Sequence, residues 1–255
     1  MMAMTDYLQF LGLDAWQFGL LVFCAMLVGF SKTGIGGMMM IAVPILAAVF
    51  GGKASTGIVL PMLIAGDVMA VAWYHRHADW SGIRRLLPWT LAGLLAGVLV
   101  GNLIDDRVFS MLIAVSIVVC LAALVFLELR GERTAMPDGL WFFALIGLAA
   151  GFTTMIGNVA GPIFTVYLLA RRLPKKDFLG TAGWFFCIIN LAKLPLQIFF
   201  WHNVTVHSTL VSLTMVPAIV AGATLGILLI RVIPEKPFRW VVIAVTALTA
   251  IRLFF

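Results

Sequence analysis

The sequence predicts an all-α polytopic membrane protein made of two inverted-topology repeats, each a broken-helix hairpin plus three transmembrane helices. Of its 255 residues, 63% are hydrophobic and only 11% are charged, whereas soluble domains carry about 25% charged residues. The apolar segments are long and show none of the alternation that is typical of transmembrane barrels. In addition, motifs of the first half recur in order in the second half.

Ten apolar segments follow one another along the chain. They cover residues 16–33, 38–50, 57–74, 86–104 and 108–128, and then 139–156, 160–170, 178–200, 209–230 and 237–254. A full span needs about 20 apolar residues, so the second segment of each set is too short to cross comfortably. We therefore divide the chain into an N-terminal segment (1–15), a first repeat (16–129), a connector (130–138) and a second repeat (139–255).

The two halves match at several positions. Gly29-Phe30 returns as Gly151-Phe152, 122 residues later. Lys53 and Gly57 match Lys176 and Gly180, Asp67 falls on Asn190, and Pro88-x4-Gly93-x3-Gly97 matches Pro217-x4-Gly222-x3-Gly226. Chance could supply one glycine pair among 24 glycines, but four ordered matches indicate a duplication.

Loop charge predicts the orientation. The excess of Lys and Arg lies in 75–85, 130–138, 171–177 and 231–237, which we place in the cytoplasm. The N-terminus, 51–56, 104–107 and 201–208 are then outside. Because 130–138 and 171–177 share a side, 139–170 must be a hairpin, and 16–50 is one by the same logic. Three further crossings invert the second half relative to the first, as in many secondary transporters.

The stretch Gly29–Gly37 interrupts an apolar run with a lysine, two hydroxyls and four glycines, and Gly151–Asn158 is its weaker echo. Backbone groups at membrane depth must be satisfied internally or line a cavity. A helix broken there leaves N–H groups that suit an anion. We expect the two breaks to face each other and to form a transport site.

The G-F-S-K-T-G-I-G-G segment, its echo and the K-x-x-x-G matches resemble the TauE/SafE family, also known as the sulfite exporter or 4-toluene sulfonate uptake permease family. The resemblance implies a secondary transporter, an exporter in many members, for sulfite, sulfoacetate or other organosulfonates, coupled to the proton gradient. It also implies a multi-pass protein of the bacterial inner membrane. The motif at the second break, Gly157–Pro162, has fewer glycines than the motif at the first break, which argues against a strictly symmetric site. The alternative is a passive anion channel or a permease for another small anion.

Three ionisable residues fall inside apolar segments, where a charge costs about 2.5–3.5 kcal/mol and usually faces a cavity or a partner. Lys32 either attracts an anion or snorkels to an interface. Asp67 and Lys193 lie in corresponding helices, so we expect them to meet. They then form a structural ion pair, or Lys193 binds the anion while Asp67 carries the coupling proton.

Neutral donors surround both breaks, although hydroxyls there can instead bond the helix backbone. The predicted substrate-binding residues are Ser31, Lys32, Thr33, Gly34, Gly36, Gly37, Thr153, Thr154, Gly157, Asn158, Asn190 and Lys193, with Asp67 as the coupling residue. The partners expected are the sulfur anion, a proton and the lipid bilayer, in a monomer or a homodimer.

Other functions find no support in the sequence. It has no Walker loop, no G-x-S-x-G and no H-E-x-x-H, so we predict neither an enzyme nor a cofactor. The stretch His75–Asp79 is interpreted as a solvated loop rather than a metal site, and the net charge of +6 marks cytoplasmic loops rather than nucleic-acid binding. Cys24, Cys120 and Cys187 are expected to be buried. The glycine stripes at Gly93–Gly101 and Gly222–Gly226 are expected to pack helices.

Overall fold

The computed structural model describes residues 11–34, 38–105, 139–171 and 173–234, together with single residues at 107, 108, 111, 115, 237 and 244, and all regular structure in these ranges is helical. The helices are α2 (Ala15–Thr33), α3 (Met39–Phe50), α4 (Gly52–Tyr74), α5 (Trp80–Leu103), α7 (Leu140–Gly157), α8 (Gly161–Ala170), α9 (Lys175–Leu196), the π-helix η3 (Gln197–Trp201), α10 (Val206–Thr214) and α11 (Val216–Val232). Apart from those single residues, the segments predicted at 108–128 and 237–254, the connector 130–138 and Cys120 lie outside the described residues.

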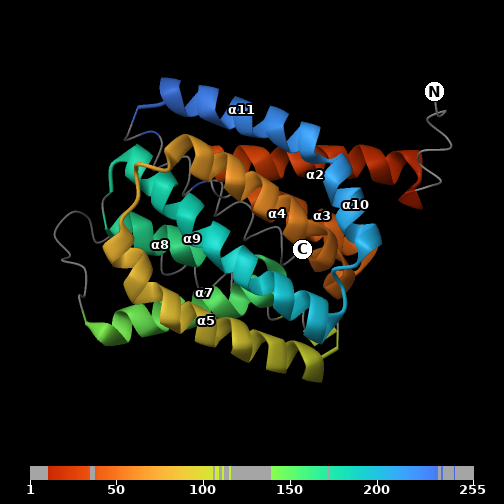
Figure 1. The fold of residues 1–255 in the computed structure, drawn as a ribbon, viewed down its shortest axis with the longest axis horizontal. Coiled ribbons are helices and arrows are strands. Elements are labelled where there is room, and N and C mark those ends of the chain that lie inside the picture. The colour runs from red at the N-terminus through yellow and green to blue at the C-terminus, as the bar shows by residue number, and fades with distance from the viewer. Residues whose placement is uncertain are drawn as a thin grey trace.

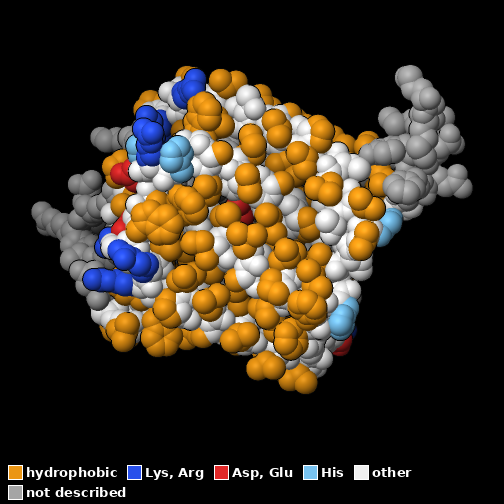
Figure 2. Space-filling view, in the orientation of Figure 1, with side chains coloured by type: hydrophobic (Ala, Val, Ile, Leu, Met, Phe, Trp, Pro, Cys, Tyr) orange, Lys and Arg blue, Asp and Glu red, His pale blue; other side chains and the backbone are white. Residues whose placement is uncertain are grey.

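Five of the described helices are long and apolar enough to cross a membrane, and α10 with α11 makes a sixth if the bent pair counts as one span. The face shown in Figure 2 is broadly hydrophobic between its two ends. These features identify a multi-pass membrane protein.

Both predicted hairpins are present among the described residues. The first break separates α2 from α3, and the second separates α7 from α8. At about 1.5 Å per residue, the 10 residues of α8 reach only about 15 Å, half of a hydrocarbon core of about 30 Å. This arm is therefore too short to cross a membrane by itself.

The apolar segment predicted at 209–230 is not one straight helix. The chain bends by 48° between α10 and α11, at Met215. Pro217 lies in the first turn of α11, where it cannot donate a backbone N–H to the preceding turn. A sequence reading based on hydropathy alone misses such a bend, because the residues on both sides of it are apolar.

Figure 1 shows α2 beside α11 along one edge of the bundle and α5 beside α7 along the opposite edge, with α4 and α9 between them. In the first edge pair, glycine brings the backbones together. A Cβ at Gly29 would collide with the carbonyl oxygen of Ile219, and one at Gly222 would collide with that of Met26. The Thr33 hydroxyl lies 2.7 Å from the carbonyl oxygen of Ala223 across the same contact.

The second edge pair has the same kind of contact. A Cβ at Gly151 would collide with the carbonyl oxygen of Thr90, and one at Gly93 would collide with that of Leu148. The predicted role of these glycine stripes in helix packing is confirmed at Gly93 and Gly222. Small residues are favoured at such crossings because the helix backbones can then touch.

The central helices α4 and α9 run antiparallel. Asp67 and Asn190 meet near the middle of the crossing, with 2.6 Å between Oδ2 and Nδ2. At one end, Gly57 is covered by the backbone of Asn203, and at the other end Gly180 is covered by the backbone of His77. The two helices therefore cross at a point that bears one carboxylate and one amide.

Three of the four loops predicted to be cytoplasmic meet at one end of the bundle. Arg171 pairs with Asp79 at 2.8 Å, and Lys175 donates to the carbonyl oxygens of Ile230 and Ile233, each at 2.7 Å. Lys and Arg side chains on the face in Figure 2 gather at this end. The fourth loop, 130–138, is outside the described residues.

The remaining loops meet at the opposite end. The Lys53 ammonium lies 3.3 Å from Oδ1 of Asn102. Nδ2 of Asn203 donates to the carbonyl oxygen of Lys53 at 2.9 Å and to the hydroxyl of Thr56 at 2.8 Å. The loops thus separate into one basic end and one nearly neutral end.

Candidate functional site

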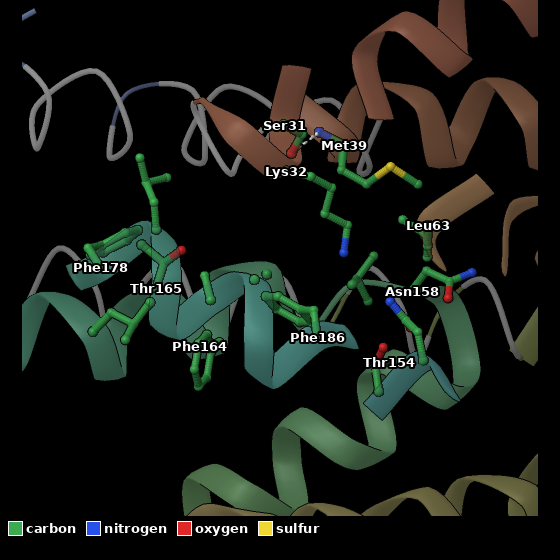
Figure 3. A pocket seen from close by; sticks show the side chains of 17 residues that line it. Ser31, Lys32, Met39, Leu63, Thr154, Asn158, Phe164, Thr165, Phe178 and Phe186 are labelled. Carbon is green, nitrogen blue, oxygen red and sulfur yellow. Dashed lines mark hydrogen bonds between the residues drawn. The ribbon is translucent and has the colours of Figure 1, made fainter. Parts of the chain in front are cut away.

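A cavity lies between the two helix breaks, and part of it reaches toward the basic end of the bundle. Its polar lining includes Ser31, Lys32, Thr154, Asn158 and Asn190. Apolar residues complete the wall, among them Met39, Phe164, Phe178, Leu179 and Phe186. Figure 3 shows Lys32 extending from α2 toward the side of the cavity that holds Phe186, Thr154 and Asn158.

Lys32 is held by a carboxylate and a ring. Its ammonium lies 2.7 Å from Oδ1 of Asp67 and 4.6 Å from the centre of the Phe186 ring. The Asp67 side chain is fully buried, whereas that of Lys32 keeps 11% of its surface exposed. Asn190 donates to the second carboxylate oxygen of Asp67. This triad joins α2, α4 and α9, with Lys32 and Asn190 in the wall of the cavity.

Lys193 is also fully buried, but its partners are neutral. Its ammonium donates to Oδ1 of Asn158 and lies 3.4 Å from the hydroxyl of Thr154. Among the described residues, no carboxylate lies within ion-pair distance of it. A buried lysine without a counter-charge is costly, so such residues in membrane helices usually mark a functional site.

The prediction that Asp67 meets Lys193 is wrong, since Asp67 pairs with Lys32 and Lys193 with the second helix break. The antiparallel crossing explains the difference. Asp67 faces Asn190, its match in the other half. Lys193 lies about one turn farther along α9, which takes it past Asp67 toward the start of α4. Sequence matching found the correct helices but not the direction in which they cross.

The second break is shaped by Asn158, which caps the C-terminus of α7 with φ 58° and ψ 27°. This left-handed conformation is uncommon outside glycine, and asparagine is among the residues that tolerate it best. The cap turns the chain into α8, and Oδ1 of the Asn158 side chain accepts a hydrogen bond from the Lys193 ammonium. Gly161, the first residue of α8, also lines the cavity.

The first break is bridged by a hydroxyl. The backbone N–H of Met39, at the start of α3, donates to Oγ of Ser31 at 3.3 Å, which is the dashed line in Figure 3. Both Met39 and Ser31 line the cavity. The N-termini of the two short helix arms, α3 and α8, thus reach the same cavity from opposite halves of the chain.

Several predicted binding residues lie elsewhere. The hydroxyls of Thr33 and Thr153 bond to helix backbone carbonyls, Thr33 to Ala223 and Thr153 to Ala149, so the reading of Thr153 as a backbone-bonding residue fits the structure better. Gly34 packs against α11. Gly157 is the buried last residue of α7 and does not line the cavity. Gly36 and Gly37 lie outside the described residues.

Sequence reasoning found Asn190 and Lys193 but missed Phe186 and Gln197, which lie at helical spacing on either side of them. Gln197, the first residue of η3, is fully buried. Residues spaced by three or four positions share a helix face. The signal in the sequence was the spacing of four residues between Lys193 and Gln197. Few other polar residues interrupt this apolar segment.

An ion pair between Arg171 and Asp79 joins two loops at the basic end of the bundle. Asp79 caps α5 and accepts hydrogen bonds from Ser81, the Gly82 backbone and Arg171. Burial alone would raise the pKa of Asp79, but these hydrogen bonds and the charge of Arg171 outweigh it and hold the pKa below its ordinary value. His77 lies 2.9 Å from Asp177 in the same region.

Other predictions concern thiols and metals. Cys24 and Cys187 are free and buried, as expected. The histidines of the loop after α4 form no metal-binding group among the described residues, since no three His, Cys, Asp or Glu side chains come together there.

Comparison with known proteins gives one match. No curated protein and no solved structure matches the chain. The family described as Sulfite exporter TauE/SafE matches residues 21–253. That range contains both helix breaks, the cavity between them and the charged residues Lys32, Asp67 and Lys193. The chain therefore belongs to the TauE/SafE sulfite exporter family, whose members are membrane transporters.

Proposed function

We propose that this protein is a secondary transporter that carries a small sulfur-containing anion, such as sulfite, sulfoacetate or another organosulfonate, out of a bacterial cell across the inner membrane. The observation that carries the proposal is Lys193, a fully buried lysine whose hydrogen-bond partners are Asn158 and Thr154. The family match supports the anion class.

The charges of the described core support an anionic substrate. Two lysines, Lys32 and Lys193, stand against one carboxylate, Asp67. One positive charge is therefore left over in a region where an unpaired charge is costly. A bound anion supplies the missing negative charge, and it reduces the cost of keeping the lysine there.

The cavity offers suitable donors for an oxyanion. The Lys32 ammonium and the Thr154 hydroxyl line it, and Lys193 lies directly behind Thr154 and Asn158. The N-terminus of α8 reaches the cavity at Gly161, and helix N-termini favour negative charge. The aromatic and aliphatic wall at Phe164 and Phe186 suits the organic part of a sulfonate.

The ion pair of Lys32 and Asp67 supports the proposal of proton coupling. An anion that binds Lys32 competes with Asp67 for the same ammonium, because only 2.7 Å separates the two residues. Asp67 is then left buried beside Asn190, and burial without a counter-charge costs a charged carboxylate more free energy than a neutral carboxyl group. Asp67 can then take up a proton, which links its protonation to anion binding.

We also propose that the halves are inverted repeats, with the boundaries 16–129 and 139–255 given above and the basic end in the cytoplasm. The glycine contacts support this. Gly29 faces Ile219, and Gly151 faces Thr90. The first members of these pairs differ by 122 positions and the second members by 129, the offsets at which the two halves match in sequence.

The decisive test measures binding and flux separately. Purified protein in detergent should bind one of sulfite, sulfoacetate or thiosulfate by calorimetry, with chloride as the control. In proteoliposomes, an imposed pH gradient should drive that anion against its own gradient. Downhill movement only would favour the alternative, a passive anion channel. Absence of binding to all three anions would reject the proposal.

The orientation is tested by labelling. A cysteine in place of Asn203 should react with an impermeant thiol reagent from outside intact cells, and one in place of Leu173 only after the membrane is opened. Reaction of both from the same side would exclude the inverted arrangement.

A further inference from the structure

Gln197 is a buried amide that the proposed function does not use. Its side chain is fully buried. Neither its oxygen nor its nitrogen has a hydrogen-bond partner among the described residues. Buried polar side chains almost always have partners, and leaving one unpaired costs about 1–3 kcal/mol. A site that bears such a cost calls for an explanation.

Its position in the helix points to the anion. Gln197 follows Lys193 by four residues, and both have helical backbone geometry, so the two side chains share one face of α9. The main chain at this position is satisfied, since the carbonyl of Gln197 accepts the N–H groups of His202 and Asn203. Only the amide group of the side chain remains without a partner.

Beyond Gln197, Trp201 packs into the neutral end of the bundle, and we call this group of contacts the Trp201 seal. Trp201 is buried and covers Gly101, and its indole nitrogen lies 3.5 Å from the carbonyl oxygen of Val98. The ammonium of Lys53 lies 5.1 Å from the Trp201 ring. Along α9, Gln197 therefore lies between Lys193, next to the cavity, and the residues that close this end.

We propose that Gln197 contacts the transported anion and that, together with Lys193, it forms a second anion position between the cavity and the Trp201 seal. The inference rests on the proposed function and extends it. The amide N–H₂ group donates two hydrogen bonds and the ammonium donates three, which is a suitable set for the oxygens of a sulfite or sulfonate group. The anion occupies this position after it leaves the cavity and before the neutral end opens.

The test compares stability, binding and flux in Gln197→Leu. Leucine removes an unpaired buried amide, so the thermal midpoint of the purified protein should stay equal or rise. Calorimetric affinity at the cavity should remain within about twofold of wild type. Flux in proteoliposomes, measured with whichever of sulfite, sulfoacetate or thiosulfate the wild type transports, should fall at least tenfold. Leu191→Ala, at a half-exposed position of the same helix, is the matched control and should transport normally.

A second variant keeps the shape of the side chain but replaces the N–H₂ donor with a carboxylate, which only accepts hydrogen bonds. Gln197→Glu offers Lys193 a carboxylate, which competes with the anion, so flux should fall by at least as much as in Gln197→Leu. Normal flux in Gln197→Leu would overturn the inference. So would a lower thermal midpoint, which would indicate that the amide holds a structural water. Loss of anion binding by wild type would instead reject the proposed function itself.

Discussion

The two lysines of the core, Lys32 and Lys193, have opposite surroundings. Lys32 comes from the end of α2, keeps a little exposed surface in the cavity and pairs with Asp67. Lys193 comes from the middle of the bundle, is fully enclosed and is hydrogen-bonded to an amide and a hydroxyl. Lys32 is thus paired with a carboxylate, whereas Lys193 has neutral hydrogen-bond partners.

This difference separates two tasks. The Lys32–Asp67 pair can be opened and closed by a competing charge, which suits coupling. Lys193 is not paired with a carboxylate among the described residues, which suits attraction of an anion. The following predictions test that division, starting with the largest expected effect.

Replacing Asp67 should be the most damaging single change. In Asp67→Leu, Lys32 loses the carboxylate with which it pairs, and breaking a buried pair costs about 3–5 kcal/mol. We expect a large drop in the thermal midpoint in detergent. The double variant Lys32→Met/Asp67→Leu should recover most of it, because no lone charge of the pair remains. A single variant as stable as wild type would show that the pair contributes nothing.

Replacing the lysines separately should give opposite results. Lys193→Met removes an uncompensated charge, so the thermal midpoint should hold or rise while calorimetric anion affinity falls at least tenfold, about 1.4 kcal/mol. Lys32→Met leaves Asp67 alone and should lower the thermal midpoint. Equal stability changes in the two variants would contradict the comparison.

Asp79 provides a smaller effect with a defined pH dependence. Its pKa in the folded protein is lowered, so its contribution is present above the unfolded value of about 3.9 and is lost as the pH falls through the folded pKa. Asp79→Asn should cost at most about 1 kcal/mol at neutral pH. Thermal unfolding between pH 7 and pH 3 should show the gap to wild type closing toward acid. A gap that does not change with pH would mean that the charge of Asp79 is not what stabilises this end.

Much of the fold was predictable because hydropathy and glycine spacing record it directly. Both breaks, the short arm α8 and the packing of Gly93 and Gly222 follow from such local patterns. The bend at Met215 was not predicted, because a proline inside an apolar run can either bend a helix or, like Pro88 in α5, remain within a continuous one. Tertiary packing decides between these outcomes.

The site was predictable only in part. Ser31, Lys32, Thr154, Asn158 and Asn190 were expected, and they do line one cavity. The partner of Asp67 was predicted wrongly because sequence offsets give the matched positions but not the direction in which α4 and α9 cross. Thr33 and Thr153 could not be told from Thr154 for a similar reason, since a hydroxyl near a break faces either the helix backbone or the cavity.

The contact of α2 with α11 has a consequence for biosynthesis. Thr33 and Ala223, which meet across it, are 190 residues apart. At about 5–20 residues per second, the ribosome needs roughly 10 to 40 s to make the second after the first. For that time the glycine face of α2 has no final partner and must lie against lipid, the translocon or other helices of the chain. The first membrane helix described here is thus among the last to reach its final packing.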